Sequence, residues 1–123
     1  MRLTIAIATL ALAACTTTGA QPANTVADGS SVILAPGQSA TLADNSRVDY
    51  LKLQGDSRCR PDVQCVWAGD AAIAMRWTPA SGTAQDFVLH TTLDPKSFVA
   101  GSRTVSLAGL ERGDAPKATL QVH

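Results

Sequence analysis

The residues best suited to chemistry are concentrated in one stretch, residues 56–70. This stretch contains Cys59 and Cys65, one of the two tryptophans, and five charged side chains around a proline. The two cysteines could form a disulfide, a redox-active pair or part of a metal site. Their spacing is not the Cys-x-x-Cys motif that activates a thiol, which disfavours a redox function. A metal site needs more ligands than two sulfurs, and neither histidine lies at ligand spacing. The spacing therefore favours a structural disulfide that closes a short loop.

The charged side chains of the same stretch have two interpretations. Arg58 and Arg60 could be displayed on a rigid ring and enter an acidic pocket of a partner, because a preorganised loop loses little entropy on binding. Alternatively, these arginines could form local ion pairs with Asp56 and Asp62, each contributing about 0 to 1 kcal/mol when exposed. Asp56 could also accept backbone N–H bonds inside the loop, as aspartates do in turns. We retain Arg58, Arg60 and Asp62 as candidate partner-binding residues.

Residues suited to catalysis are few. His90 could act as a base, but the chain has neither a nucleophile elbow nor an identifiable pair of catalytic carboxylates. It also lacks the motifs of phosphate loops, zincins and EF-hands. We expect His90 to lie on the solvent face of its strand. The sequence thus predicts a protein that is not an enzyme and that has no cofactor and no metal.

The first fourteen residues predict an export signal. Arg2 supplies a positive start, and residues 3–12 form an apolar run. That run is about half as long as a helix that spans a bilayer, so a signal peptide fits better than a membrane anchor.

The end of this run, Leu-Ala-Ala-Cys at residues 12–15, resembles the lipobox of bacterial lipoproteins. The resemblance implies cleavage before Cys15, lipidation of that cysteine, and anchoring by several acyl chains such as palmitate. An ordinary secretory signal is the alternative. Thr16 in place of aspartate suggests, by similarity to enterobacterial sorting, an outer-membrane protein that faces the periplasm.

Lipidation of Cys15 would leave Cys59 and Cys65 as a pair in an oxidising compartment, where disulfides persist. Loss of Arg2 with the signal would leave nine Lys and Arg against ten Asp and Glu. This near-neutral balance provides no electrostatic footprint for nucleic acid. The expected partners are therefore the membrane, through the lipid, and an envelope protein.

The remaining chain is typical of an all-β domain. Residues 15–27 are small and polar and predict a flexible tether, which leaves residues 28–123 for the domain. Alternating apolar residues at 71–78 and 118–122, and Leu51 and Leu53 on one face of their strand, indicate strands with one buried face. About seven strands with turns between them predict a small antiparallel β-sandwich, with a small barrel as the alternative.

The two tryptophans are expected in the core of this domain. Trp67 is predicted to begin a buried strand directly after the cysteine loop, and Trp77 to lie on the inner face of the same strand region. A tryptophan packed over a disulfide is common in sandwiches. The alternative is an exposed aromatic platform for a sugar or a peptide.

The run Asp-Ser-Arg-Cys at 56–59, followed by Val63, Cys65, Trp67 and Gly69, resembles a motif of small, mostly uncharacterised bacterial envelope proteins. That motif reads D-S-R-C-P-x-x-V-x-C-x-W-x-G, and here the proline comes one position later. The resemblance implies an envelope location and a shared fold, and brings no known activity. We therefore expect a lipid-anchored, non-catalytic accessory or binding module. The alternative is an envelope inhibitor that uses loop 58–62 for insertion.

Overall fold

The computed structural model describes residues 24–60 and 62–123. The predicted signal peptide (1–14), Cys15 and most of the predicted tether lie outside the described residues. The described chain forms nine strands, and it has no helix long and apolar enough to cross a membrane. In chain order the strands are β1 (Asn24–Val26), β2 (Ser31–Leu34), β3 (Ser39–Leu42), β4 (Arg47–Asp56), β5 (Ala71–Thr78), β6 (Gln85–His90), β7 (Ser97–Ala100), β8 (Arg103–Leu110) and β9 (Ala118–Val122).

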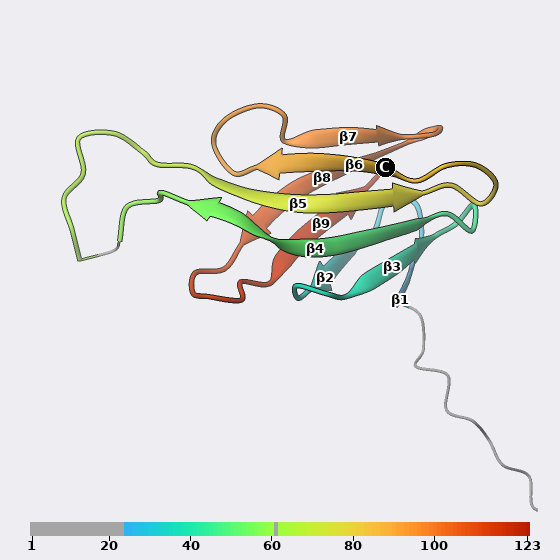
Figure 1. The fold of residues 1–123 in the computed structure, drawn as a ribbon, viewed down its shortest axis with the longest axis horizontal. Helices are drawn as coiled ribbons and strands as arrows, with labels where there is room; N and C mark the ends of the chain where they lie inside the picture. Colours follow the sequence, from blue (N-terminus) through green and yellow to red (C-terminus); the bar gives the residue numbers. More distant parts are fainter. Residues whose placement is uncertain (1–23, 61) are drawn as a thin grey trace, which may run out of the picture.

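The strands form two sheets that pack face to face (Figure 1). One sheet has the order β1-β3-β4-β5-β6 and the other β2-β9-β8-β7. Neighbouring strands are antiparallel, except that β1 runs parallel to β3. The predicted β-sandwich is therefore confirmed, and the barrel alternative is wrong because the sheets remain separate. Two short strands, β1 and β7, had not been predicted.

The core lies between the two inner faces, as the alternating pattern predicts. On β5, Ile73 and Met75 are fully buried, and on β9 Leu120 and Val122 are nearly so. Tyr50 of β4 is also fully buried, and its hydroxyl donates a hydrogen bond of 2.9 Å to the carbonyl oxygen of Pro116. A buried phenol needs such a partner, because an unpaired polar group in the core would be destabilising.

A bulge in β4 changes which side chains of that strand face the core, compared with the prediction. The pairing with β5 shifts between Tyr50 and Lys52, which leaves Leu51 as the extra residue. Val48 and Tyr50 therefore face the core before the bulge, and Leu53 packs against it after the bulge. The prediction that Leu51 and Leu53 share one face is wrong, because an inserted residue reverses the alternation.

The positions of the two tryptophans differ. Trp77 is half-buried against the core, with its ring 6.1 Å from that of Phe98 in an edge-on arrangement. Trp67 is 77% exposed, and β5 begins only at Ala71. The prediction that Trp67 starts a buried strand and fills the core is wrong. Aromatic packing between the sheets comes instead from Phe87 and Phe98, whose rings stack at 3.9 Å.

Strand pairing also begins earlier than predicted. Residues 24–26, assigned to the tether from composition, pair with β3 as β1. Val26 is 2% exposed and belongs to the core. The folded domain therefore includes residues before Asp28, because even one buried valine on a paired strand adds to the apolar contact.

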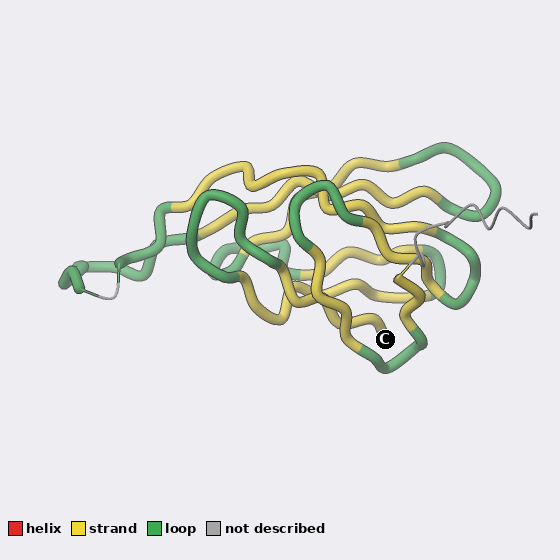
Figure 2. Tube along the Cα trace, turned by 90° about the horizontal axis from the view of Figure 1, so that it is seen from below, coloured by secondary structure: helices red, strands yellow, loops and turns green. Residues whose placement is uncertain are grey.

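The loop between β4 and β5 extends beyond the sandwich. We call its described residues, 57–60 and 62–70, the projecting loop. It lies at one end of the long axis of the molecule, and β1 begins toward the opposite end, as Figures 1 and 2 both show.

Candidate functional site in the projecting loop

The projecting loop is closed at its base by backbone pairing that continues the β4–β5 hairpin. The Ser57 N–H donates to the Asp70 carbonyl oxygen at 2.8 Å. The Ser57 hydroxyl donates to the same oxygen at 2.9 Å and accepts from the Asp70 N–H at 3.0 Å. Gly69 makes this base possible, since a Cβ at that position would lie 1.7 Å from the Ser57 carbonyl oxygen. The base is thus set by a close approach that only glycine permits.

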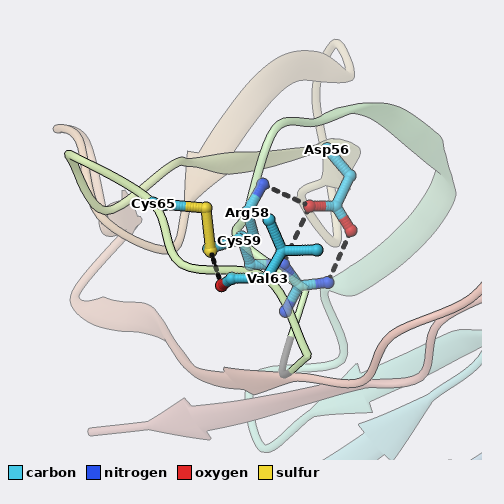
Figure 3. The surroundings of a disulfide bond; sticks show 5 residues. All are labelled: Asp56, Arg58, Cys59, Val63 and Cys65. Carbon is cyan, nitrogen blue, oxygen red and sulfur yellow. Dashed lines mark hydrogen bonds and ion pairs between the residues drawn. A yellow bond between two sulfur atoms is a disulfide. The ribbon is translucent and has the colours of Figure 1, made fainter.

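Within the loop, Cys59 and Cys65 form the predicted disulfide, with Cα atoms 6.0 Å apart (Figure 3). The ring also contains a backbone hydrogen bond of 3.1 Å from Val63 N–H to the Arg60 carbonyl oxygen. The Cys59 sulfur contacts the Val63 carbonyl oxygen at 2.9 Å. This contact is not a hydrogen bond, because a disulfide sulfur carries no proton. The ring is therefore held by one covalent bond and one backbone turn.

Arg58 holds the base of the ring to the sandwich. Its Nε and Nη2 donate to the two carboxylate oxygens of Asp56 at 2.9 and 2.7 Å (Figure 3). The Arg58 backbone N–H donates to the same Asp56 carboxylate at 3.0 Å. Its Nη1 donates to the Leu110 carbonyl oxygen at 2.7 Å and its Nη2 to that of Glu111 at 2.6 Å. The hydrogen bond from the Arg58 side chain lowers the pKa of Asp56.

These contacts argue against Arg58 as a partner-binding residue. The Arg58 side chain is only 13% exposed, and its guanidinium is occupied by internal acceptors. It joins the loop to the end of β8 and is not displayed for a partner. The two structural alternatives for Asp56, ion pairing and acceptance of a backbone N–H, occur together.

Arg60 and Asp62, the other two candidate residues, are exposed. Neither takes part in an ion pair with any residue that the structure describes. Arg60 lines a cleft together with Arg58 and with Arg112 of the β8–β9 connection. The structure thus separates the predicted set: Arg58 is internal, and Arg60 and Asp62 remain available.

The projecting loop exposes three apolar side chains. Exposure of Trp67 was the alternative to a core position, whereas exposure of Val63 and Val66 had not been predicted. Val63 is 51% exposed, Val66 is 93% exposed and Trp67 is 77% exposed. All three lie outside the paired base, where neither sheet can cover them. Gly69 and Asp70, which follow Trp67 before the alternating pattern starts, were the available signal that Trp67 precedes the strand.

His90 pairs with Asp70 at the base of the loop. Its Nδ1 lies 2.6 Å from Asp70 Oδ2, and Asp70 Oδ1 accepts from the N–H groups of Thr92 and Leu93 at 2.9 and 3.1 Å. Burial opposes ionisation of Asp70, but these hydrogen bonds outweigh it and lower the pKa of Asp70 to about 2. His90 lies on the outer face of β6, as predicted, because it pairs with Ala72 while the neighbouring Leu89 and Ile73 face the core. Its side chain is nevertheless only 22% exposed, and it contacts Asp70.

The side chains that could bind a metal ion are spread apart in the described structure. Among residues 24–60 and 62–123, no three His, Cys, Asp or Glu side chains lie close enough together to hold a metal ion. The fold and the loop define a two-sheet β-sandwich with a disulfide-closed projecting hairpin. No protein family, no curated protein and no solved structure matches the chain.

Proposed function

We propose that this protein is a lipid-anchored component of the bacterial cell envelope that acts as a non-catalytic binding module. The projecting loop is its contact element. The observation that carries the proposal is the exposure of Val66 and Trp67, at 93% and 77%, on a loop whose conformation is fixed at two places.

An exposed tryptophan on a fixed loop is well suited to binding. Tryptophan is enriched among the residues that contribute most to interface affinity, because its large apolar surface is buried on contact. The disulfide and the Ser57–Asp70 base hold the loop before any partner arrives. Less conformational entropy is therefore lost on binding than with an open loop.

The position of the loop fits an anchored protein. β1 and the projecting loop lie toward opposite ends of the long axis (Figures 1 and 2). An acyl anchor at Cys15, which precedes β1 in the chain, would then hold the opposite end of the domain near the membrane. The loop would be presented away from the lipid surface, where another envelope protein could reach it.

The polar groups around the loop support a non-catalytic role. Nδ1 of His90 contacts the Asp70 carboxylate, which also receives two backbone N–H groups. The Ser57 hydroxyl is bonded to the backbone of Asp70 and so belongs to the base of the loop. These contacts join the projecting loop to the β6–β7 connection, and a structural role is sufficient to explain them.

An inhibitor that inserts this loop into another protein is the second candidate. The exposure of Val63 within the disulfide ring favours it, because a stapled ring with an outward apolar side chain can enter a pocket. The two candidates differ in their effect on the partner. An inhibitor would abolish the partner's activity on binding, and an accessory module would not.

Crosslinking in intact cells tests the contact element. A photo-reactive residue is introduced at Val66, with Ile33 on β2 as the control because it is also exposed, at 59%. We expect one protein to be captured from position 66 and not from position 33, and the capture to be lost in Trp67→Ala. Equal capture from both positions, or capture unaffected by Trp67→Ala, would contradict the proposal.

The lipid anchor is tested separately. Cys15→Ala should leave the protein unprocessed or release it from the membrane fraction, because the acylated cysteine would be lost. Continued acylation of this variant would show that the anchor lies elsewhere.

A further inference from the structure

A cleft of about 360 Å³ lies beside the base of the projecting loop. It is formed by the loop on one side and by the β8–β9 connection on the other. Its lining residues are Asp56, Arg58, Arg60, Arg112, Gly113 and Asp114. Three arginines from two separate segments therefore line one open space.

Arg58 determines how these two segments meet. It is bound to Asp56 next to the loop and to the carbonyl oxygens of Leu110 and Glu111 at the start of the β8–β9 connection. Arg112 follows directly after those carbonyl groups. The hydrogen bonds of Arg58 thus hold the projecting loop, which carries Arg60, against the β8–β9 connection, which carries Arg112.

The charges of the cleft do not cancel. Two carboxylates line the cleft, those of Asp56 and Asp114. Asp56 is hydrogen-bonded by the side chain and the backbone of Arg58, and its pKa is lowered by Arg58 and also by the charge of Arg112. Neither Arg60 nor Arg112 forms an ion pair within the described part of the chain. One positive charge in the cleft is therefore in excess over the carboxylates around it.

We propose that this cleft binds an oxyanion, a carboxylate or phosphate group of a ligand, through Arg60 and Arg112. A guanidinium donates two parallel N–H bonds to such a group, and these charge-assisted bonds are stronger than neutral ones. Arg60 and Arg112 come from the two segments that line the cleft, so both can contribute N–H donors to one anion. Anion binding in this cleft and the proposed apolar contact through Trp67 use different residues, so either can occur without the other.

The test is a titration of the full chain followed by NMR, with inorganic phosphate in one arm and succinate in the other. Both are run at constant ionic strength, because screening alone weakens any exposed ion pair. The backbone amide signals of Arg60 and Gly113 report on the cleft. We expect saturable shifts in at least one arm, and Arg60→Gln or Arg112→Gln should weaken binding on the order of tenfold.

Arg47→Gln is the matched control, because Arg47 is 58% exposed on β4 and does not line the cleft. This variant should bind like the unaltered chain. Saturation by phosphate alone identifies a phosphate group as the ligand, and saturation by succinate identifies a carboxylate. Absence of saturable shifts in both arms overturns the proposal. So does equal binding by Arg60→Gln, Arg112→Gln and Arg47→Gln.

Discussion

The carboxylate of Asp70 lies 2.6 Å from Nδ1 of His90, at the point where the projecting loop returns to β5. The same carboxylate accepts the N–H groups of Thr92 and Leu93, and the Thr92 hydroxyl donates to the Gly69 carbonyl oxygen at 2.8 Å. One side chain therefore joins the base of the projecting loop to the β6–β7 connection. This junction is charged, so its strength depends on pH.

We expect Asp70→Asn to destabilise the protein at neutral pH and to have less effect in acid. The pKa of Asp70 is lowered from 3.8 to about 2 in the folded protein. Because the folded-state pKa lies below the unfolded one, the stabilisation is complete well above pH 4 and is lost as the pH falls toward 2. Hydrogen bonds to a charged group contribute about 1.5 to 3 kcal/mol, which sets the scale of the loss at pH 7.

Urea denaturation at neutral pH and near pH 2.5 checks this expectation. The free energy of unfolding should differ between Asp70→Asn and the unaltered chain at neutral pH and converge in acid. Asp62→Asn is the control, because Asp62 is exposed and forms no ion pair with any residue that the structure describes. A difference that stays constant over this range would show that ionisation of Asp70 does not stabilise the junction.

Gly69→Ala should be strongly destabilising, because the added Cβ would meet the Ser57 carbonyl oxygen at 1.7 Å. The base of the loop must open to relieve this clash, at a cost on the order of 2 to 4 kcal/mol. Gly55→Ala on β4 is the matched control, since nothing lies within 4 Å of a Cβ at that position. Thermal unfolding of the two variants gives the comparison, and equal melting temperatures would contradict the close approach.

Removal of the disulfide by Cys59→Ser with Cys65→Ser should lower the free energy of unfolding by about 2 kcal/mol, since the ring is small. The effect on the loop should exceed the effect on the sandwich, because both cysteines lie outside the core. Limited proteolysis is expected to cleave the variant within residues 58–69 while both sheets remain intact. Cleavage at the same rate in the oxidised protein would show that the ring does not order the loop.

Arg58→Met should cost more stability than Arg60→Met, although both arginines flank the same cysteine. Loss of the Arg58 guanidinium removes its hydrogen bonds to two backbone carbonyl groups and to the Asp56 carboxylate, which keeps only the backbone N–H of residue 58, at about 1 to 3 kcal/mol. Arg60 has no such internal partner, so its replacement should change the free energy of unfolding by less than about 0.5 kcal/mol. Chemical denaturation distinguishes the two, and a larger loss for Arg60→Met would reverse the assignment.

The sequence by itself determined the class of fold and the inner faces of β5 and β9. Alternation with a period of two sorts the side chains of β5 and β9 into buried and exposed sets, whatever the partner strands are. The cysteine spacing predicted the ring, and the turn residues Pro36 and Gly37 lie in the break between β2 and β3. Gly37 indeed has a φ of 88°, a conformation that glycine adopts without strain. These features depend on neighbours in the chain, so the chain alone shows them.

Only the tertiary structure decided which residues of the loop are available to other molecules. Trp67 is exposed because the sheet ends at the Ser57–Asp70 pairing. Gly69 and Asp70 indicate in the sequence that Trp67 precedes β5, but only the contact between β4 and β5 decides where their pairing ends. Arg58 is internal because its acceptors on Leu110 and Glu111 lie more than fifty residues away in the chain. The amino-acid sequence shows which side chains are charged and how large they are. The partner of each charged group and the residues that cover each apolar side chain depend on contacts between segments that are distant in the chain. Only the folded structure shows these contacts.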